Sequence, residues 1–322
     1  MSKILQLLLI SLIFFIIELI FIKVAQKFNI LDNPNHRSSH TNEIVRGGGI
    51  IFWFAGLFFM AKYCCEFQLF FTGLTIVAIV SFIDDLRSLS WWSRLFGHLT
   101  GATLVFYSQN FFQLLPWYFI VVGYILFIGT LNTFNFMDGI NGITGLYSLS
   151  VLAPLQWINM NVVSFIGPDF IWYPLIASVV FLLFNFRKHA ICFAGDVGSI
   201  TIGFWIITLL IMLIIKTNNI VWLLFLAVYG TDSILTIFQR LWLRQNIFEA
   251  HRMHLYQVLA NECRLDHRII SFIYALLQAI IAMIIIVLYT KLNLICLSAI
   301  ILLPLVAVYL LKFWIQYLKE SR

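Results

Sequence analysis

The chain has 322 residues, of which 62% are hydrophobic and 11% are charged. Soluble proteins usually contain about 45–50% apolar and about 25% charged residues, so this composition excludes an ordinary soluble protein. The net charge of +6 would suggest a nucleic-acid partner in a soluble chain. Here we attribute it to membrane topology and expect no nucleic-acid binding. We treat residues 1–322 as a single integral membrane domain.

Long apolar runs fill most of the chain. A membrane-spanning helix needs about 20 apolar residues, with roughly 17–25 tolerated. The candidate runs are 4–22, 49–65, 67–83, 95–108, 115–131, 142–158, 170–185, 197–215, 220–236, 269–289 and 292–311. We therefore predict an all-α polytopic membrane protein with about 11 transmembrane helices. The run 95–108 is short and contains His98, so ten spans are an alternative.

Lys and Arg are distributed unevenly between the two sides of the bilayer. If 4–22 is a retained first span that runs inward, one side carries 16 of the 20 Lys and Arg residues. That side comprises the connections 23–48, 84–94, 132–141, 186–196 and 237–268 together with the C-terminus. Because basic connections favour the cytoplasm, we predict an N-out, C-in topology. The polar motifs of the chain then face the cytoplasm.

The first of these connections is basic and glycine-rich. Arg37, His40 and Arg46 precede three glycines at 47–49. The basic side chains can bind phosphate. The glycines allow the backbone to approach an anion, or allow two helices to pack closely. An ordinary basic loop is the alternative interpretation.

Carboxylates lie at the ends of two apolar runs on the same side. Asp84 and Asp85 follow the third run, and Asp196 precedes the eighth. Such carboxylates are costly unless they are paired or bind a cation, and Mg²⁺ prefers a few carboxylates with waters and phosphate oxygens. Alternatively, one of the pair is a base, or these residues are a solvated helix end and an N-cap.

Amides, an aromatic ring and histidines occur in the other connections. Asn132, Asn135 and Asp138 recur at a spacing of three, so they can share one face of a helix end. Phe193 could stack on a base. The loop 237–268 contains the two histidines and the arginine of 251–254. Zinc is one interpretation of that pair, but no third soft ligand is near, so we prefer phosphate contacts.

The other histidines and the cysteines fit no site. His98 and His189 look incidental, and the five cysteines lack metal or disulfide spacing. The five polar connections are informative together, since carboxylates, amides and basic groups at one membrane face suit a Mg²⁺-bound diphosphate. The sequence therefore predicts a phosphoryl-transfer site.

The ordered set of motifs resembles the polyprenyl-phosphate N-acetylhexosamine-1-phosphate transferases, known as glycosyltransferase family 4. The matching stretches are 32–40, 84–85, 132–139, 193–199 and 251–254. The resemblance implies transfer of a sugar-1-phosphate from a UDP-N-acetylhexosamine to undecaprenyl phosphate at a bacterial inner membrane. UMP would leave, and Mg²⁺ would be required, with Mn²⁺ as a substitute.

The resemblance also implies residue roles. The expected catalytic carboxylates are Asp84, Asp85 and Asp138. Those expected to hold the nucleotide are Asn132, Asn135, Asn141 and Phe193. Those expected to contact phosphate are Arg37, His40, His251, Arg252 and His254. The expected metal ligands are Asp196 and Asn135.

Two departures indicate a branch of the family. Ser88 stands where a third Asp is frequent, and residues 255–257 replace further histidines. They point away from the peptidoglycan branch and toward a surface-polysaccharide, O-antigen-initiating branch. The sequence leaves open which sugar is transferred and whether the chain forms a homodimer. It also leaves open whether the attack is direct or passes through an aspartyl-phosphate intermediate.

Two rival classes are a transporter of an anionic solute and a non-catalytic scaffold. Transporters usually place polar residues at mid-membrane on broken helices. In this chain the spans are nearly free of charge, with Glu18 and Asp232 as the exceptions. A scaffold would not require Asp84, Asp85 and Asp196, so carboxylate substitution separates it from an enzyme.

Overall fold

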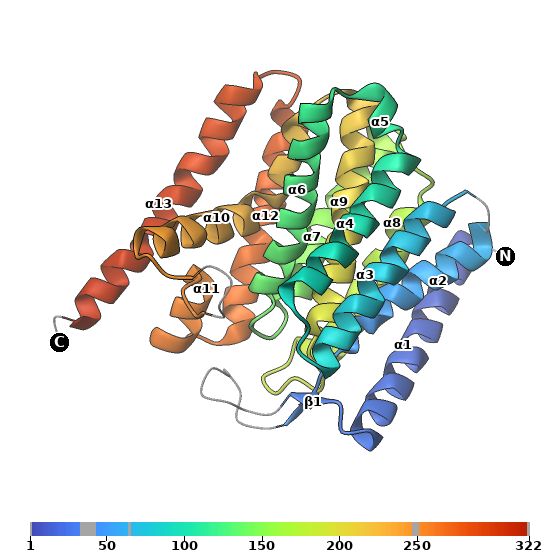
Figure 1. Cartoon of the computed structure of the whole chain (residues 1–322), viewed down its shortest axis with the longest axis horizontal. Coiled ribbons are helices and arrows are strands. Elements are labelled where there is room, and N and C mark those ends of the chain that lie inside the picture. The colour runs from blue at the N-terminus through green and yellow to red at the C-terminus, as the bar shows by residue number, and fades with distance from the viewer. Residues whose placement is uncertain (1, 33–42, 64–65, 247–250, 321–322) are drawn as a thin grey trace.

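A computed structural model describes residues 2–32, 43–63, 66–246 and 251–320. The described chain is a bundle of helices with two short antiparallel strands, β1 (Leu31–Asp32) and β2 (Ile44–Val45) (Figure 1). The helices of 13 residues or more are α1 (Lys3–Lys27), α2 (Ile51–Tyr63), α3 (Gln68–Leu86), α4 (Trp91–Ser108), α6 (Trp117–Met137), α7 (Ile143–Asn161), α8 (Asp169–Asn185), α9 (Gly195–Thr217), α10 (Ala227–Trp242), α12 (His267–Leu288) and α13 (Leu294–Glu320). The shorter elements are α5 (Phe111–Leu114), α11 (Leu255–Gln257), the 3-10 helices η1 (Gly48–Ile50) and η2 (Ile220–Leu226), and the π-helix η3 (Val258–Glu262).

Seven of the helical segments are long and apolar enough to cross a membrane: Lys3–Lys27, Gln68–Leu86, Trp117–Met137, Gly195–Thr217, Ile220–Trp242, His267–Leu288 and Leu294–Ile315. The segments Gly48–Tyr63 and Asp169–Asn185 are shorter apolar helices. The predicted all-α polytopic class is therefore confirmed. The total of eleven spans stays a prediction.

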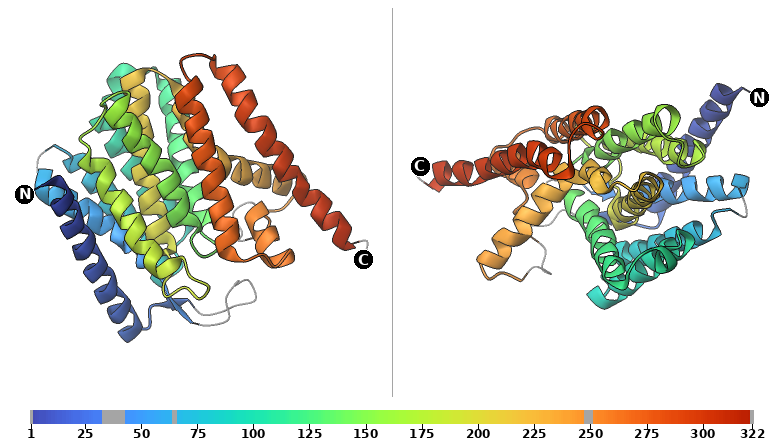
Figure 2. Two further views of the ribbon diagram at one scale, coloured as in Figure 1. Left: turned by 180° about the vertical axis from the view of Figure 1, so that it is seen from behind. Right: turned by 90° about the horizontal axis from the view of Figure 1, so that it is seen from above.

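Helix α9 lies inside the bundle and is surrounded by other helices (Figure 2). Every residue from Val197 to Leu213 is buried. A helix that is apolar on all faces is stable when protein covers all of them. Its first turn meets η1 so closely that a Cβ on Gly49 would lie 2.3 Å from the Cα of Gly198. At this position the glycine-rich segment therefore serves close packing of the backbone.

The ninth predicted span, 220–236, is divided between two elements. A 3-10 helix covers Ile220–Leu226, and α10 then runs across the long axes of its neighbours (Figures 1 and 2). The cause is a polar stripe at helical spacing, since Asp232, Thr236 and Arg240 share the buried face of α10. These groups need polar partners, and the chain supplies them from α12, α13 and the segment before α11.

The polar connections gather at one end of the bundle. The turns after α3, α6 and α8 lie at the lower end in Figure 1, together with β1 and α11. We call this the motif end. The starts of α1 and α8 and the end of α2 lie toward the other end, which we call the opposite end. The sequence placed the motifs on one side, and the arrangement of the helices agrees with this.

Candidate active site

Asp85, in the last turn of α3, caps the N-terminus of α9. Its Oδ1 accepts from the backbone N–H of Asp196 at 2.9 Å, and its Oδ2 accepts from that of Val197 at 2.9 Å. A helix N-terminus carries partial positive charge, which favours a carboxylate. Gly195 has φ +68, and a Cβ there would lie 2.7 Å from Asp85 Oδ2, so this close approach requires glycine. Asp85 thereby holds the backbone of Asp196 in place.

Arg46 lies against the same carboxylates. Its Nε is 2.7 Å from Asp85 Oδ1, and its Nη2 is 3.7 Å from Asp196 Oδ1. Burial alone would lower the pKa of Arg46, but the charges of Asp85 and Asp196 outweigh it and raise this pKa. Its backbone is anchored nearby, since Phe193 N–H donates to Val45 O at 2.8 Å. The guanidinium thus pairs with carboxylates, a role that the sequence analysis did not foresee.

Asp84 has different surroundings from Asp85. One carboxylate oxygen accepts from the backbone N–H of Leu89 at 2.6 Å, and the other lies 3.3 Å from Arg94 Nη1. The carboxyl groups of Asp84 and Asp196 are within hydrogen-bonding reach of each other. Two carboxylates so close repel unless a proton or a cation lies between them. The adjacent pair is therefore divided between two tasks, and Asp84 faces Asp196.

Asp138 ends α6 near this cluster. Thr144 Oγ1 donates to its Oδ1 at 2.6 Å. Burial raises the pKa of Asp138 to about 7; the Thr144 hydrogen bond opposes the rise, and the charge of Asp85 adds to it. A carboxyl group with a pKa near neutrality can accept and release a proton at physiological pH. Asp138 is therefore suited to proton transfer.

The carboxylates fit Mg²⁺ better than a metal with a full protein cage. In the described part of the chain, no group of three or more His, Cys, Asp or Glu side chains is arranged to hold a metal ion. Mg²⁺ is usually bound by one or two carboxylates together with waters and substrate phosphates. The neighbouring Asp84 and Asp196 carboxyl groups supply such a pair. The donor set therefore suits Mg²⁺ that arrives with a phosphorylated substrate.

A groove of about 1150 Å³ lies between α4, α6, α10 and the segment that contains His251 and His254. Most of its lining is apolar, and Arg94, Asn132 and Asn135 are among its polar side chains. Because Arg94 also contacts Asp84, the groove adjoins the carboxylates. An apolar groove with a few convergent polar groups suits a ligand with an apolar chain and a polar head.

The residues 251–254 present polar atoms that need a partner. Among the described residues, His254 Nε2 and Arg252 Nη2 are buried and have no hydrogen-bond partner. Buried polar atoms are nearly always satisfied, so these two indicate a polar ligand at this place. His251 Nδ1 accepts from Met253 N–H at 3.3 Å, which leaves the proton on Nε2. Burial and the neighbouring His254 lower the pKa of His251 to about 4, so this ring is neutral at pH 7.

The remaining predicted residues are placed as follows. Asn141 donates its amide N–H to the carbonyl of Arg187 at 2.8 Å, so it ties two loops of the motif end together. Phe193 is held through its backbone beside β2. Arg37 and His40 lie outside the described residues. The nucleotide and phosphate roles of these residues stay predictions.

One histidine that the sequence analysis interpreted as incidental lines the groove. His98 on α4 is 2% exposed and lines the groove. Its Nε2 has no partner within the part of the chain that the structure describes. The signal in the sequence was a titratable residue inside an apolar run, which is a functional candidate by default in a membrane protein.

Comparison with protein families gives one match. Residues 67–214 match Glycosyl transferase family 4. Over this region the chain is similar to that family. The match includes Asp84, Asp85, Asp138 and Asp196, and it supports a membrane transferase of the polyprenyl-phosphate sugar-1-phosphate kind. A comparison with curated proteins gave no match.

The region that matches the family supplies only part of the candidate site. The four carboxylates come from residues 67–214. Arg46, which pairs with two of them, precedes that region. His254 and the helices α10, α12 and α13 follow it. The basic groups that face the carboxylates and the groove are therefore contributed largely by segments outside the family match.

Proposed function

We propose that the chain transfers an N-acetylhexosamine-1-phosphate from a UDP-sugar to undecaprenyl phosphate and releases UMP. The product would begin a lipid-linked, O-antigen-like surface polysaccharide. The observation that carries the proposal is the junction of the two parts of the site, where Arg94 lines the apolar groove and also contacts Asp84. A polyprenyl chain suits the groove, and its phosphate would then lie toward the carboxylates.

In the proposed reaction, an oxygen of the lipid phosphate attacks the β-phosphorus of the UDP-sugar. The bond between that phosphorus and the oxygen bridging to the α-phosphorus breaks, and UMP leaves. Asp138 is suited to take a proton from the acceptor, because its pKa is about 7. Asp85 is engaged by Arg46 and by α9, so it positions Asp196. Mg²⁺ held by Asp84 and Asp196 would neutralise the diphosphate charge.

The nucleotide half of the donor would lie beside the metal region. Asn132 and Asn135 line the groove from the last turns of α6. Phe193 precedes the first turn of α9 and is partly exposed, so its ring could stack on uracil. In this proposal both the uridine and the lipid phosphate lie next to the carboxylates, because Asn132 and Asn135 line the same groove as Arg94.

The product identifies the reaction. Membranes that contain the wild-type chain or Asp196→Asn are incubated with undecaprenyl phosphate and radiolabelled UDP-GlcNAc, UDP-GalNAc, UDP-FucNAc or UDP-QuiNAc. We expect UMP and a diphosphate-linked lipid from the wild type with one of these donors, and neither from the variant. Release of UDP would instead indicate a glycosyl transfer that leaves both phosphates on the nucleotide.

We also propose an N-out, C-in orientation in a bacterial inner membrane, with the motif end in the cytoplasm. The basis is the excess of Lys and Arg in the connections of that end. Reporter fusions at positions 45, 90, 192 and 255 test it. All four should report the cytoplasm, and a periplasmic signal at 192 or 255 would contradict a site on one face.

A further inference from the structure

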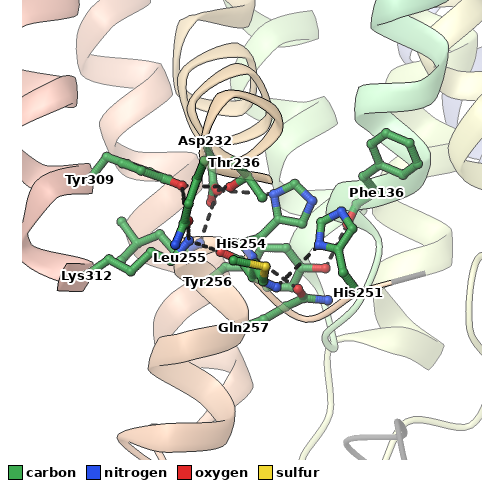
Figure 3. A network of polar contacts seen from close by, with 12 residues as sticks. Phe136, Asp232, Thr236, His251, His254, Leu255, Tyr256, Gln257, Tyr309 and Lys312 are labelled. Atoms are coloured by element: carbon green, nitrogen blue, oxygen red, sulfur yellow. Dashed lines mark hydrogen bonds and ion pairs between the residues drawn. The ribbon is translucent and has the colours of Figure 1, made fainter. Parts of the chain in front are cut away.

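Asp232 is a buried carboxylate on α10 that lies outside the cluster described above. It is 3% exposed. Its Oδ2 accepts from the hydroxyl of Tyr274 at 2.8 Å, and its Oδ1 accepts from the backbone N–H of Leu255 at 3.1 Å. Thr236 Oγ1 also donates to Oδ1 at 3.3 Å. The same Oδ1 lies 3.2 Å from Nδ1 of His254 (Figure 3).

These contacts decide the orientation of the His254 ring. An ionised carboxylate only accepts hydrogen bonds, and the Leu255 N–H is a donor in any state. With Asp232 as the acceptor, His254 Nδ1 must carry the proton, because two acceptors would otherwise face each other. Nε2 is then the nitrogen available to a ligand. It is buried, it lacks a partner among the described residues, and its ring lines the groove.

The backbone around His254 is fixed on both sides. Before it, the carbonyl of Met253 accepts from Lys312 Nζ on α13. After it, the hydroxyl of Tyr256 donates to the carbonyl of Phe136 on α6 at 2.8 Å. Figure 3 shows Tyr309 and Lys312 on one side of this segment and Phe136 and His251 on the other. Neither the ring nor its backbone needs to reorganise when a ligand enters the groove.

We propose that Asp232 is a positioning residue that holds His254 so that Nε2 meets the phosphate of the lipid acceptor in the groove. The proposal rests on the proposed function, because it requires a phosphate-bearing lipid at that place. Asp232 touches no substrate and acts through the ring. It sets the tautomer and stabilises positive charge on the imidazole while an anion is bound, as carboxylates do behind other functional histidines.

A double-mutant cycle with Asp232→Asn and His254→Ala tests this inference on purified protein. Each single variant should raise the KM for undecaprenyl phosphate about tenfold, the lower end of the range for losing the orienting partner of a histidine ligand. The KM for the UDP-sugar should change little. In the His254→Ala background, Asp232→Asn should have no further effect. The proposal would be overturned if the KM increases of the two single variants multiplied in the double variant, or if Asp232→Asn had the KM of the wild type.

Two further variants separate positioning from folding. Asp169→Asn is the matched control, because Asp169 is also 3% exposed and also accepts from several side chains, but it lies at the opposite end. It should lower the melting temperature without changing either KM. If Asp232→Asn does not fold, Tyr274→Phe keeps the carboxylate and removes one donor. It should raise the same KM by a smaller factor, and an unchanged KM would contradict the proposal.

Binding without turnover distinguishes this inference from the proposed reaction. Undecaprenyl phosphate alone should raise the melting temperature of the wild type, and this shift should be lost in Asp232→Asn and in His254→Ala. A wild type that shows the shift but forms no product with any UDP-sugar would refute the reaction and leave the positioning role supported. A wild type that forms product, with an unchanged shift in Asp232→Asn, would refute the positioning role alone.

Discussion

Both ends of the bundle bury carboxylates, but the balance of charge around them differs. At the opposite end, Asp169 receives Lys3 Nζ, Lys62 Nζ at 2.6 Å and Tyr63 OH at 2.7 Å. One carboxylate there has two cationic partners. These contacts tie the start of α1, the end of α2 and the start of α8 together. Such a group is satisfied by the protein itself.

The motif end has the reverse balance. Arg46 serves both Asp85 and Asp196, while Asp84 approaches Asp196 and Asp138 lies near Asp85. Among the residues that the structure describes, carboxylates there outnumber the cations that pair with them. A buried charge is costly unless it is paired, so this arrangement is favourable only with an added cation or with protonation. A carboxylate with more than one cationic partner, such as Asp169, indicates a structural ion pair. A cluster with more carboxylates than cations indicates a site that binds a cation.

The largest expected effect comes from removing a carboxylate charge at the motif end. Asp196→Asn keeps the size of the side chain and removes the charge that a hard cation needs. Because a bound metal supplies several kcal/mol of charge stabilisation, we expect transfer to fall about 100-fold or more at any Mg²⁺ concentration. Product formation in membranes with matched protein levels measures it. Wild-type turnover would mean that Asp196 serves only the helix end.

Substitution of Asp84 and substitution of Asp85 should differ in their effects on protein stability. Asp85→Asn weakens the cap of α9 and leaves Arg46 without part of its charge partner, so we expect the free energy of unfolding to fall by about 2 kcal/mol. Asp84→Asn should reduce transfer strongly with little loss of stability, because it relieves repulsion with Asp196. Melting curves in detergent, together with transfer assays, compare the two. Equal loss of stability in both variants would contradict the division of tasks.

The ion pairs of Asp169 at the opposite end should affect protein stability alone. Asp169→Asn removes the charge that Lys3 and Lys62 share, and both lysine side chains are more than a third exposed. Solvent screening limits such pairs, so we expect a loss of about 1 kcal/mol in the free energy of unfolding. Activity per folded molecule should be unchanged. A large loss of activity would show that the two ends are coupled.

A pH dependence of stability is also expected at the motif end. The pKa of Asp138 is raised from its usual 3.8 to about 7 in the folded chain, so the folded state binds more protons than the unfolded state between these values. Stability should therefore decline as pH rises from about 4 to about 7 and change little above that. Melting temperatures with EDTA present measure it. Asp138→Asn should flatten the decline, and an unchanged decline would assign it to another group.

Particular residues show what the sequence could not resolve at the motif end. Asp84 and Asp85 are neighbours with the same chemistry, and their sequence positions predict similar roles. The structure separates them, since Asp85 meets the N-terminus of α9 and Asp84 meets Arg94. Arg46 was expected beside phosphate and lies beside carboxylates. Arg46 is 39 residues from Asp85 along the chain, and the backbone N–H of Asp196 that Asp85 binds is 111 residues away. No local pattern encodes contacts over such separations.

The apolar runs by themselves determined the class of the protein, because hydrocarbon demands long apolar helices whose backbone bonds are internal. The order of the motifs also predicted the family, and the match over residues 67–214 agrees. The course of α10 was decided only by tertiary structure. Its hydropathy resembles a straight span, but its polar stripe is satisfied by Tyr274, His254 and Tyr309 from other segments. Buried polar groups need hydrogen-bond partners, and here the folded chain supplies those partners from distant segments.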